Sequence, residues 1–118
     1  MEQLANPPVL VLVRDLMFSG RIGAEARAAG ANVKMLRDPK LLAEAPADAT
    51  RLIVDLDLAG ALEAAAAWKT RDPGREVITF VAHTNVDAIR TARDAGLNQI
   101  LTRGQFVEVL PRLLSREG

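Results

Sequence analysis

Two carboxylates one residue apart, Asp55 and Asp57, follow a short apolar run in the middle of the chain. The run, Leu52–Val54, shows no polar alternation, which is typical of a strand covered on both faces of a parallel sheet. Acids at the carboxyl end of such a strand lie where open α/β sheets bind their ligands. The stretch 51–60 is therefore the expected centre of a functional site.

A further acid, Asp15, follows the first apolar run, Val9–Val13. Parallel strands bring their carboxyl ends to one edge, so Asp15 and Asp55 together could ligate a hard divalent cation, with water as the remaining ligand. Without a cation, the two acids would repel each other and the pKa of one would rise. The alternative is that both acids only cap the ends of strands and helices. The residue types alone leave both readings open.

Apolar runs and breaker residues predict five strands alternating with five helices. The expected strands are 9–13, 32–36, 52–54, 76–82 and 98–102. The expected helices are 17–29, 40–44, 61–69, one opened by Thr84 as its cap and ended by Gly96, and 105–116, with a bend at Pro111. This alternation predicts an α/β fold: one doubly wound, five-stranded parallel sheet of order 2-1-3-4-5, in a single domain spanning 1–118.

Composition narrows the function classes. The chain has 118 residues, 15 basic and 15 acidic side chains and no cysteine. Balanced charge gives no support for nucleic-acid or membrane partners, and the absence of cysteine excludes disulfides and thiolate chemistry. The first residues lack the pattern of a signal peptide, so we expect a cytoplasmic protein.

The layout resembles the receiver domains of two-component response regulators over essentially the whole chain. The most specific match is the run 55–60, DLDLAG, which stands where receivers carry a phospho-accepting Asp followed by a Met/Leu-Pro-Gly run. The resemblance implies that Asp55 is the phosphoacceptor and Asp15 a magnesium ligand. It also implies a histidine kinase or another signalling protein as the partner.

Several positions depart from the receiver pattern. Arg14 replaces the first acid of the metal-binding pair, Val81 replaces the switch hydroxyl, and Arg103 replaces the lysine. Arg103 keeps a positive charge but is larger and forked. We therefore predict a degenerate receiver in which Arg14 pairs with Asp55 in place of a cation, while Arg103 leans toward the acids. Apart from weakly bound Mg²⁺, no cofactor is expected.

The last helix carries more apolar residues than one sheet-facing stripe requires. This excess favours a homodimer or partner interface through Phe106, Leu110, Leu113 and Leu114, unless the helix is simply well buried. His83, the one histidine, is interpreted as a solvated loop residue, and Trp68 as part of the core.

Three functions follow from this reading. The first is a stand-alone signalling module that acts by protein contacts, without catalysis, with its phosphorylation switch lost or altered. The second is a working phosphoacceptor that uses Asp55 with Mg²⁺. The third is a small-molecule sensor at the same edge of the sheet. No nucleophile–base pair or cofactor fingerprint favours a hydrolytic or redox enzyme.

Overall fold

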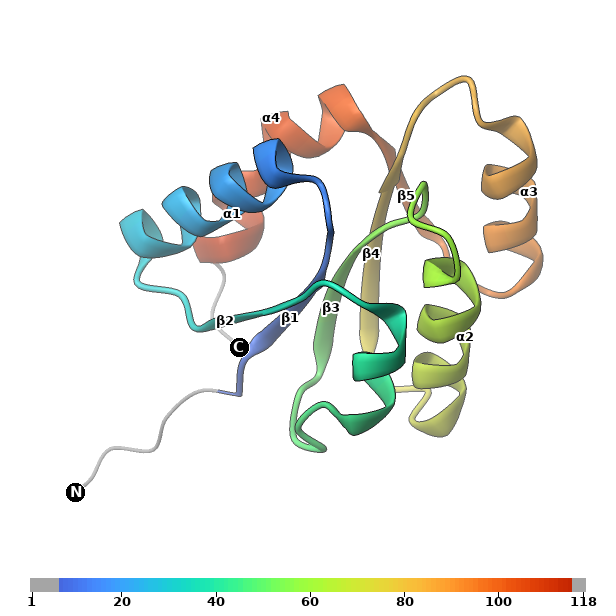
Figure 1. Ribbon diagram of the computed structural model, residues 1–118, viewed down its shortest axis with the longest axis horizontal. Coiled ribbons are helices and arrows are strands. Elements are labelled where there is room, and N and C mark those ends of the chain that lie inside the picture. Colours follow the sequence, from blue (N-terminus) through green and yellow to red (C-terminus); the bar gives the residue numbers. More distant parts are fainter. Residues whose placement is uncertain (1–6, 116–118) are drawn as a thin grey trace.

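The computed structural model describes residues 7–115, which form ten elements (Figure 1). The strands are β1 (Val9–Leu12), β2 (Val33–Leu36), β3 (Arg51–Asp55), β4 (Glu76–Val81) and β5 (Gln99–Thr102). The helices are α1 (Leu16–Ala29), the 3-10 helix η1 (Pro39–Glu44), α2 (Ala61–Arg71), α3 (Val86–Asp94) and α4 (Arg103–Ser115).

All five strands form one parallel sheet of order β2-β1-β3-β4-β5. This order confirms the predicted α/β fold class and topology. β3 lies at the centre, and every one of its five residues is buried. β2 and β5 are the edge strands. The carboxyl ends of β1, β3, β4 and β5 therefore meet along one rim, as the sequence pattern required.

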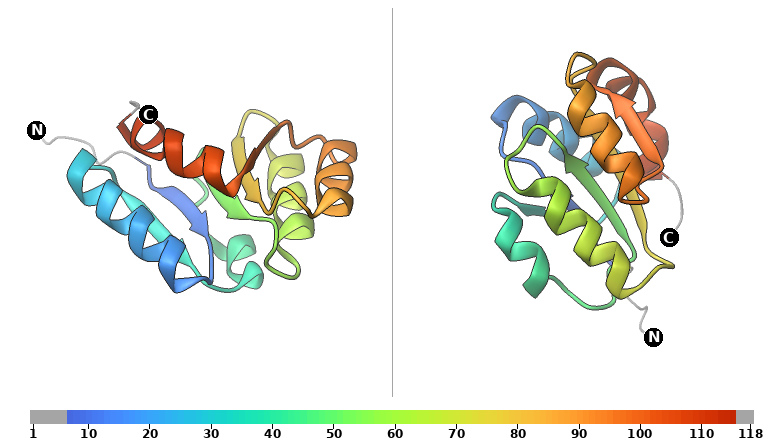
Figure 2. Two further views of the ribbon diagram at one scale, coloured as in Figure 1. Left: turned by 90° about the horizontal axis from the view of Figure 1, so that it is seen from above. Right: turned by 90° about the vertical axis from the view of Figure 1, so that its right-hand side faces the viewer.

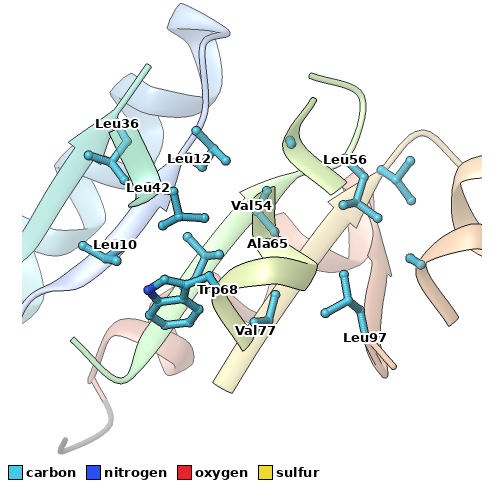
Figure 3. Close-up of a cluster of buried hydrophobic side chains, with 14 of the residues drawn as sticks. Leu10, Leu12, Leu36, Leu42, Val54, Leu56, Ala65, Trp68, Val77 and Leu97 are labelled. Carbon is cyan, nitrogen blue, oxygen red and sulfur yellow. The ribbon is translucent and has the colours of Figure 1, made fainter. Parts of the chain in front are cut away.

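Helices cover both faces of the sheet (Figure 2). On one face α1 and α4 enclose a core that includes Ile22, Ile53 and Phe106; on the other, η1, α2 and α3 enclose a second core around Leu52 and Trp68. The Trp68 indole is 1% exposed and lies among leucines and valines of β1, β3 and η1 (Figure 3), which confirms its interpretation as a core residue.

The four apolar residues expected at an interface are core residues instead. Phe106 and Leu110 are fully buried, and Leu113 and Leu114 are 9% and 3% exposed. All four pack in the cluster under α1 and α4. The interface prediction for these residues is wrong, because α4 contacts α1 as well as the sheet and so needs a wider apolar face than a helix on a sheet alone.

Helix ends follow the capping rules with one correction. Asp15 caps α1 by accepting from the backbone N–H groups of Met17 and Phe18. The cap of α3 is Asn85, which accepts from the N–H of Ala88, and not the expected Thr84. α4 begins at Arg103, two positions before the predicted start, and continues through Pro111; its expected last residue, Arg116, lies outside the described residues.

Within residues 7–115, no helix combines the length and the apolar character needed to cross a membrane.

Candidate functional site

The rim of the sheet brings Asp55, Asp57 and Arg103 together. Asp55 is the last residue of β3, and its side chain is only 6% exposed. The backbone N–H of Asp57 donates to Asp55 Oδ1 at 2.9 Å, so the chain turns tightly over the buried carboxylate. Gly60 follows with a φ of +83°, a left-handed conformation that favours glycine, and leads the chain into α2.

Arg103 closes the site from the start of α4. Its Nη2 lies 3.4 Å from Asp55 Oδ2 and 3.1 Å from Asp57 Oδ2, so a single guanidinium nitrogen contacts both carboxylates. Arg103 therefore leans toward the acids, as expected from the sequence. Arginine stays charged at any pH a protein survives, so this positive charge is permanent.

Three phenylalanines support the Arg103 guanidinium. Its carbon lies 4.8 Å from the ring centroid of Phe18 and 5.8 Å from that of Phe80. Phe80 in turn stacks on Phe106 with centroids 4.2 Å apart. A cation over aromatic faces is attracted to them and is held in a defined orientation. The sequence did not predict this arrangement, because Phe18, Phe80 and Phe106 are far apart in the chain and only the fold brings them together.

Asp57 joins two loops at the rim. Its Oδ2 accepts the backbone N–H of Ala82 at 2.9 Å, and its Oδ1 accepts from Asn85 Nδ2 at 2.8 Å. The β3–α2 loop is thereby bound to the β4–α3 loop by one carboxylate. Asn85 was not among the site residues predicted from the sequence, where its position between β4 and α3 was the only available signal.

The environments of the two acids shift their pKa values in opposite directions. Burial raises the pKa of Asp55; the nearby charges of Asp57 and Asp15 add to the increase, while the Asp57 N–H and Arg103 oppose it. For Asp57, partial burial favours a higher pKa, but the hydrogen bonds from Asn85, Ala82 and Arg103 outweigh it and lower the pKa. Asp57 is thus the acid whose ionised form the site stabilises, whereas the site penalises ionisation of Asp55.

Arg14 does not take the position expected of it. It is exposed, and within residues 7–115 it forms no ion pair with Asp55. The prediction that Arg14 would pair with Asp55 is therefore wrong: the arginine beside this carboxylate is Arg103. Arg14 lies in the short link between β1 and α1, where the chain directs its side chain to solvent.

Asp15, Val81 and His83 complete the positions named from the sequence. Asp15 is exposed and its carboxylate caps α1, yet its charge still acts on Asp55. Val81 ends β4 and is 1% exposed, packed in the core without a hydroxyl. His83 is an exposed loop residue. Within the described residues, no group of three or more His, Asp or Glu side chains forms an arrangement that could hold a metal ion.

No protein-family model and no curated protein matches the sequence. Solved structures do match the fold. A response regulator from Thermotoga maritima matches with a TM-score of 0.70 and 15% identity, over 95% of this chain and 100% of that one. A CheY-like receiver domain protein from Methanospirillum hungatei JF-1 matches with a TM-score of 0.73 and 12% identity, over 93% and 94% of the two chains.

A response regulator protein from Burkholderia pseudomallei gives a TM-score of 0.73 at 19% identity, over 92% of this chain and 66% of that one. That protein was crystallised with a phosphorylated aspartic acid, a calcium ion and citrate. At these identities the likeness concerns the fold. Sheet order, helix placement and structural similarity agree, and the chain has the fold of a response regulator receiver domain.

Proposed function

We propose that this protein is a receiver-fold signalling module that acts through protein contacts and does not use phosphorylation of Asp55 as its switch. The observation that carries the proposal is the Arg103 guanidinium, whose Nη2 contacts the carboxylates of both Asp55 and Asp57. The proposal retains the non-catalytic role and the cytoplasmic location expected from the sequence.

Phosphoryl transfer to a carboxylate requires an accessible nucleophile and a cation that neutralises the incoming group. Asp55 is 94% covered, and both of its oxygens lie 3.4–3.5 Å from Arg103 Nη2. The guanidinium therefore occupies the side from which a phosphoryl group would be stabilised. Buried Val81 offers no hydroxyl to contact such a group.

A divalent cation fits this donor set poorly. Hard cations such as Mg²⁺ need several oxygen ligands. Oδ1 of Asp15 already accepts two backbone N–H groups, and Asp57 is fully engaged with Asn85, Ala82 and Arg103. The fixed positive charge of Arg103 would also repel a metal ion at Asp55. We infer that Arg103 supplies internally the charge that a bound cation supplies elsewhere.

Intact-mass spectrometry after incubation with acetyl phosphate and Mg²⁺ tests the proposal. The expected result is no phosphoryl adduct on the wild-type protein. A double variant, Arg103→Lys with Val81→Thr, supplies a smaller cation and a hydroxyl, and we expect it to gain an adduct. Adding Asp55→Asn to that background is the control and removes the adduct. A wild-type adduct that disappears in Asp55→Asn would instead establish the phosphoacceptor function.

A further inference from the structure

A groove on the opposite side of α1 from α4 is separate from the Arg103 site. It lies between α1 and the edge strand β2 and encloses about 610 Å³. Val33 and Met35 of β2 and Gly20 and Gly23 of α1 are among the residues that line it. In Figure 1, α1 leads through a short loop into β2. Because β2 is an edge strand, the groove lies at the margin of the sheet. We call this feature the α1–β2 groove.

The two glycines of α1 keep the groove open. Neither Gly20 nor Gly23 has a positive φ, so the helix backbone does not require glycine at these positions. A Cβ atom at Gly20 would meet nothing within 4 Å, and one at Gly23 would make only ordinary contacts, 3.6 Å from Arg27 and 3.9 Å from Met35. Glycine inside a helix costs about 1 kcal/mol relative to alanine. The fold of this chain therefore gains nothing from these glycines, and their effect is to leave space beside β2.

The outer edge of β2 can accept another strand. Within residues 7–115, β2 pairs only with β1, in parallel register from Val9↔Val33 to Leu12↔Leu36. Alternate residues of a strand point their backbone N–H and C=O groups to opposite sides. Asn32 and Leu36 accept hydrogen bonds from β1, so the backbone groups of Val33 and Met35 point outward, beside the groove. An extended segment placed there would find backbone partners as well as apolar contacts.

Charge selects the occupant. The exposed side chains of Arg27 and Arg37 line the groove. Among residues 7–115, no acidic residue lines it, and neither arginine forms an ion pair there. Lys34 adds an exposed positive charge on β2 itself. A second copy of this chain paired edge to edge would bring these like charges together, which is unfavourable. An acidic strand would meet complementary charge.

The geometry points to a docking site for an acidic, extended segment of a partner protein, which pairs with the edge of β2 and places apolar side chains in the α1–β2 groove. Leu16, which also lines the groove and is 72% exposed, supplies an apolar contact at one end. The inference rests on the proposed function only in that the protein acts through a bound partner. It does not depend on the state of Asp55.

The probe is a short fluorescein-labelled peptide in which every second residue is threonine and the residues between them are alternately valine and glutamate, so that valine and glutamate share the face turned to the groove. Fluorescence anisotropy measures its affinity, and two-dimensional amide NMR maps where it binds. We expect amide shifts concentrated at Gly20, Gly23, Val33 and Met35. The double variant Arg27→Glu/Arg37→Glu should weaken binding on the order of tenfold or more. The matched control Arg90→Glu/Arg93→Glu makes the same charge change on α3 and should leave the affinity unchanged.

Steric and backbone controls separate this mode from simple charge attraction. Gly20→Leu fills the groove and should reduce binding, whereas Ala24→Leu, an exposed α1 position that does not line the groove, should not. A peptide N-methylated at every residue cannot donate to β2 in either strand direction and should bind weakly, and the same peptide with lysine in place of glutamate should not bind.

Several results would overturn the inference. One is the absence of amide shifts at millimolar peptide. Another is a lysine peptide that binds as tightly as the glutamate peptide. A third is a loss of affinity in the α3 control variant as large as that in Arg27→Glu/Arg37→Glu. Sedimentation that shows self-association abolished by Arg27→Glu would assign the groove to a second copy instead. The phosphoryl-adduct experiment reads out Asp55 alone, so failure of one proposal is distinguishable from failure of the other. Peptide binding by Asp55→Asn, expected to equal that of the wild type, links the two measurements.

Discussion

At the scale of single residues, the site depends on how three charged side chains divide their interactions. Asp55 and Asp57 share one cation, yet Asp57 also receives two further hydrogen bonds, while Asp55 is more deeply buried. The Arg103 guanidinium favours the ionised form of both acids. Burial outweighs it at Asp55, whose pKa is raised, whereas at Asp57 it adds to the other hydrogen bonds and the pKa is lowered. This difference makes opposite predictions for the two positions.

Asp55→Asn is expected to raise the free energy of unfolding at neutral pH. Because the folded-state pKa of Asp55 is above its unfolded value of 3.8, the folded state holds its proton more tightly, and stability from this group falls as the pH rises through the folded pKa. Urea unfolding of the variant and the wild type at several pH values measures the difference. It should be largest at neutral pH and shrink on acidification. A less stable variant at neutral pH would contradict the balance of burial and pairing described above.

Asp57→Asn is expected to lower the free energy of unfolding at neutral pH by about 1–3 kcal/mol, because an amide cannot serve Arg103, Asn85 and Ala82 together. The pKa of Asp57 is lowered, so its contribution is present above its unfolded value of 3.8 and is lost as the pH falls through the folded pKa. The gap between variant and wild type should therefore narrow in acid. The same urea series checks it, and a gap that stays constant with pH would argue against an ionic role.

At the scale of elements, local backbone rules explain why the helices begin and end where they do. Asp15 and Asn85 cap α1 and α3 through a side-chain oxygen, and Gly60, just before α2, has a positive φ. α1 is different, because two of its interior residues are glycines that its own backbone does not require. Replacing glycine should therefore change the stability in opposite directions inside α1 and at the start of α2.

Gly20→Ala and Gly60→Ala should change stability in opposite directions. Alanine at Gly20 has free space and a helical backbone, so we expect a gain of about 0.5–1 kcal/mol. Alanine at Gly60 must adopt a φ of +83°, so we expect a loss of about 1 kcal/mol or more. Thermal unfolding by circular dichroism measures both. Equal effects at the two positions would show that the helix and the turn do not differ as described.

At the scale of the whole molecule, two cores stabilise the sheet, one on each face, and α4 belongs to the core with α1. The apolar residues of α4 named above are therefore part of the interior. Among the described residues, the exposed large apolar side chains lie elsewhere: Leu16 and Met17 at the start of α1, Leu41 in η1 and Val86 at the start of α3.

Leu110→Ala should lower the free energy of unfolding by about 2–5 kcal/mol, because it leaves a cavity in a fully buried position. Leu16→Ala, which removes the same atoms from a side chain that is 72% exposed, should change it by less than about 0.5 kcal/mol. Chemical denaturation of both variants provides the comparison. If Leu110→Ala altered the sedimentation behaviour but not the stability, the residue would belong to an interface after all.

The sequence predicted the sheet order, because short apolar runs separated by helical stretches leave few topologies once the right-handed crossover rule applies. It also placed Asp55, Asp57 and Arg103 at one rim, since parallel strands end at one edge. The prediction that Arg14 is the partner of Asp55 was wrong, because the partner is Arg103. That outcome depends on the phenylalanine rings of α1 and β4 beneath the guanidinium, which are brought together only by the folded chain.

The same limit explains the misassigned face of α4. Apolar periodicity shows how much of a helix is buried but not what covers it, and here α1 covers part of what the sequence suggested was exposed. The cap of α3 was missed by one residue because Thr84 and Asn85 are both capable caps, and the loop geometry selects between them.

Trp68 gives the molecule a built-in optical reporter. The chain has one tryptophan and no tyrosine, so near-ultraviolet excitation at the red edge addresses a single indole. That indole is enclosed between α2 and β3, with the guanidinium of Arg75 4.4 Å from its ring centroid. Emission should therefore be blue-shifted when the chain is folded and move to longer wavelength on denaturation. The emission of Trp68 reports on the face of the sheet that carries α2. A structural change confined to the opposite face would therefore leave the spectrum unchanged.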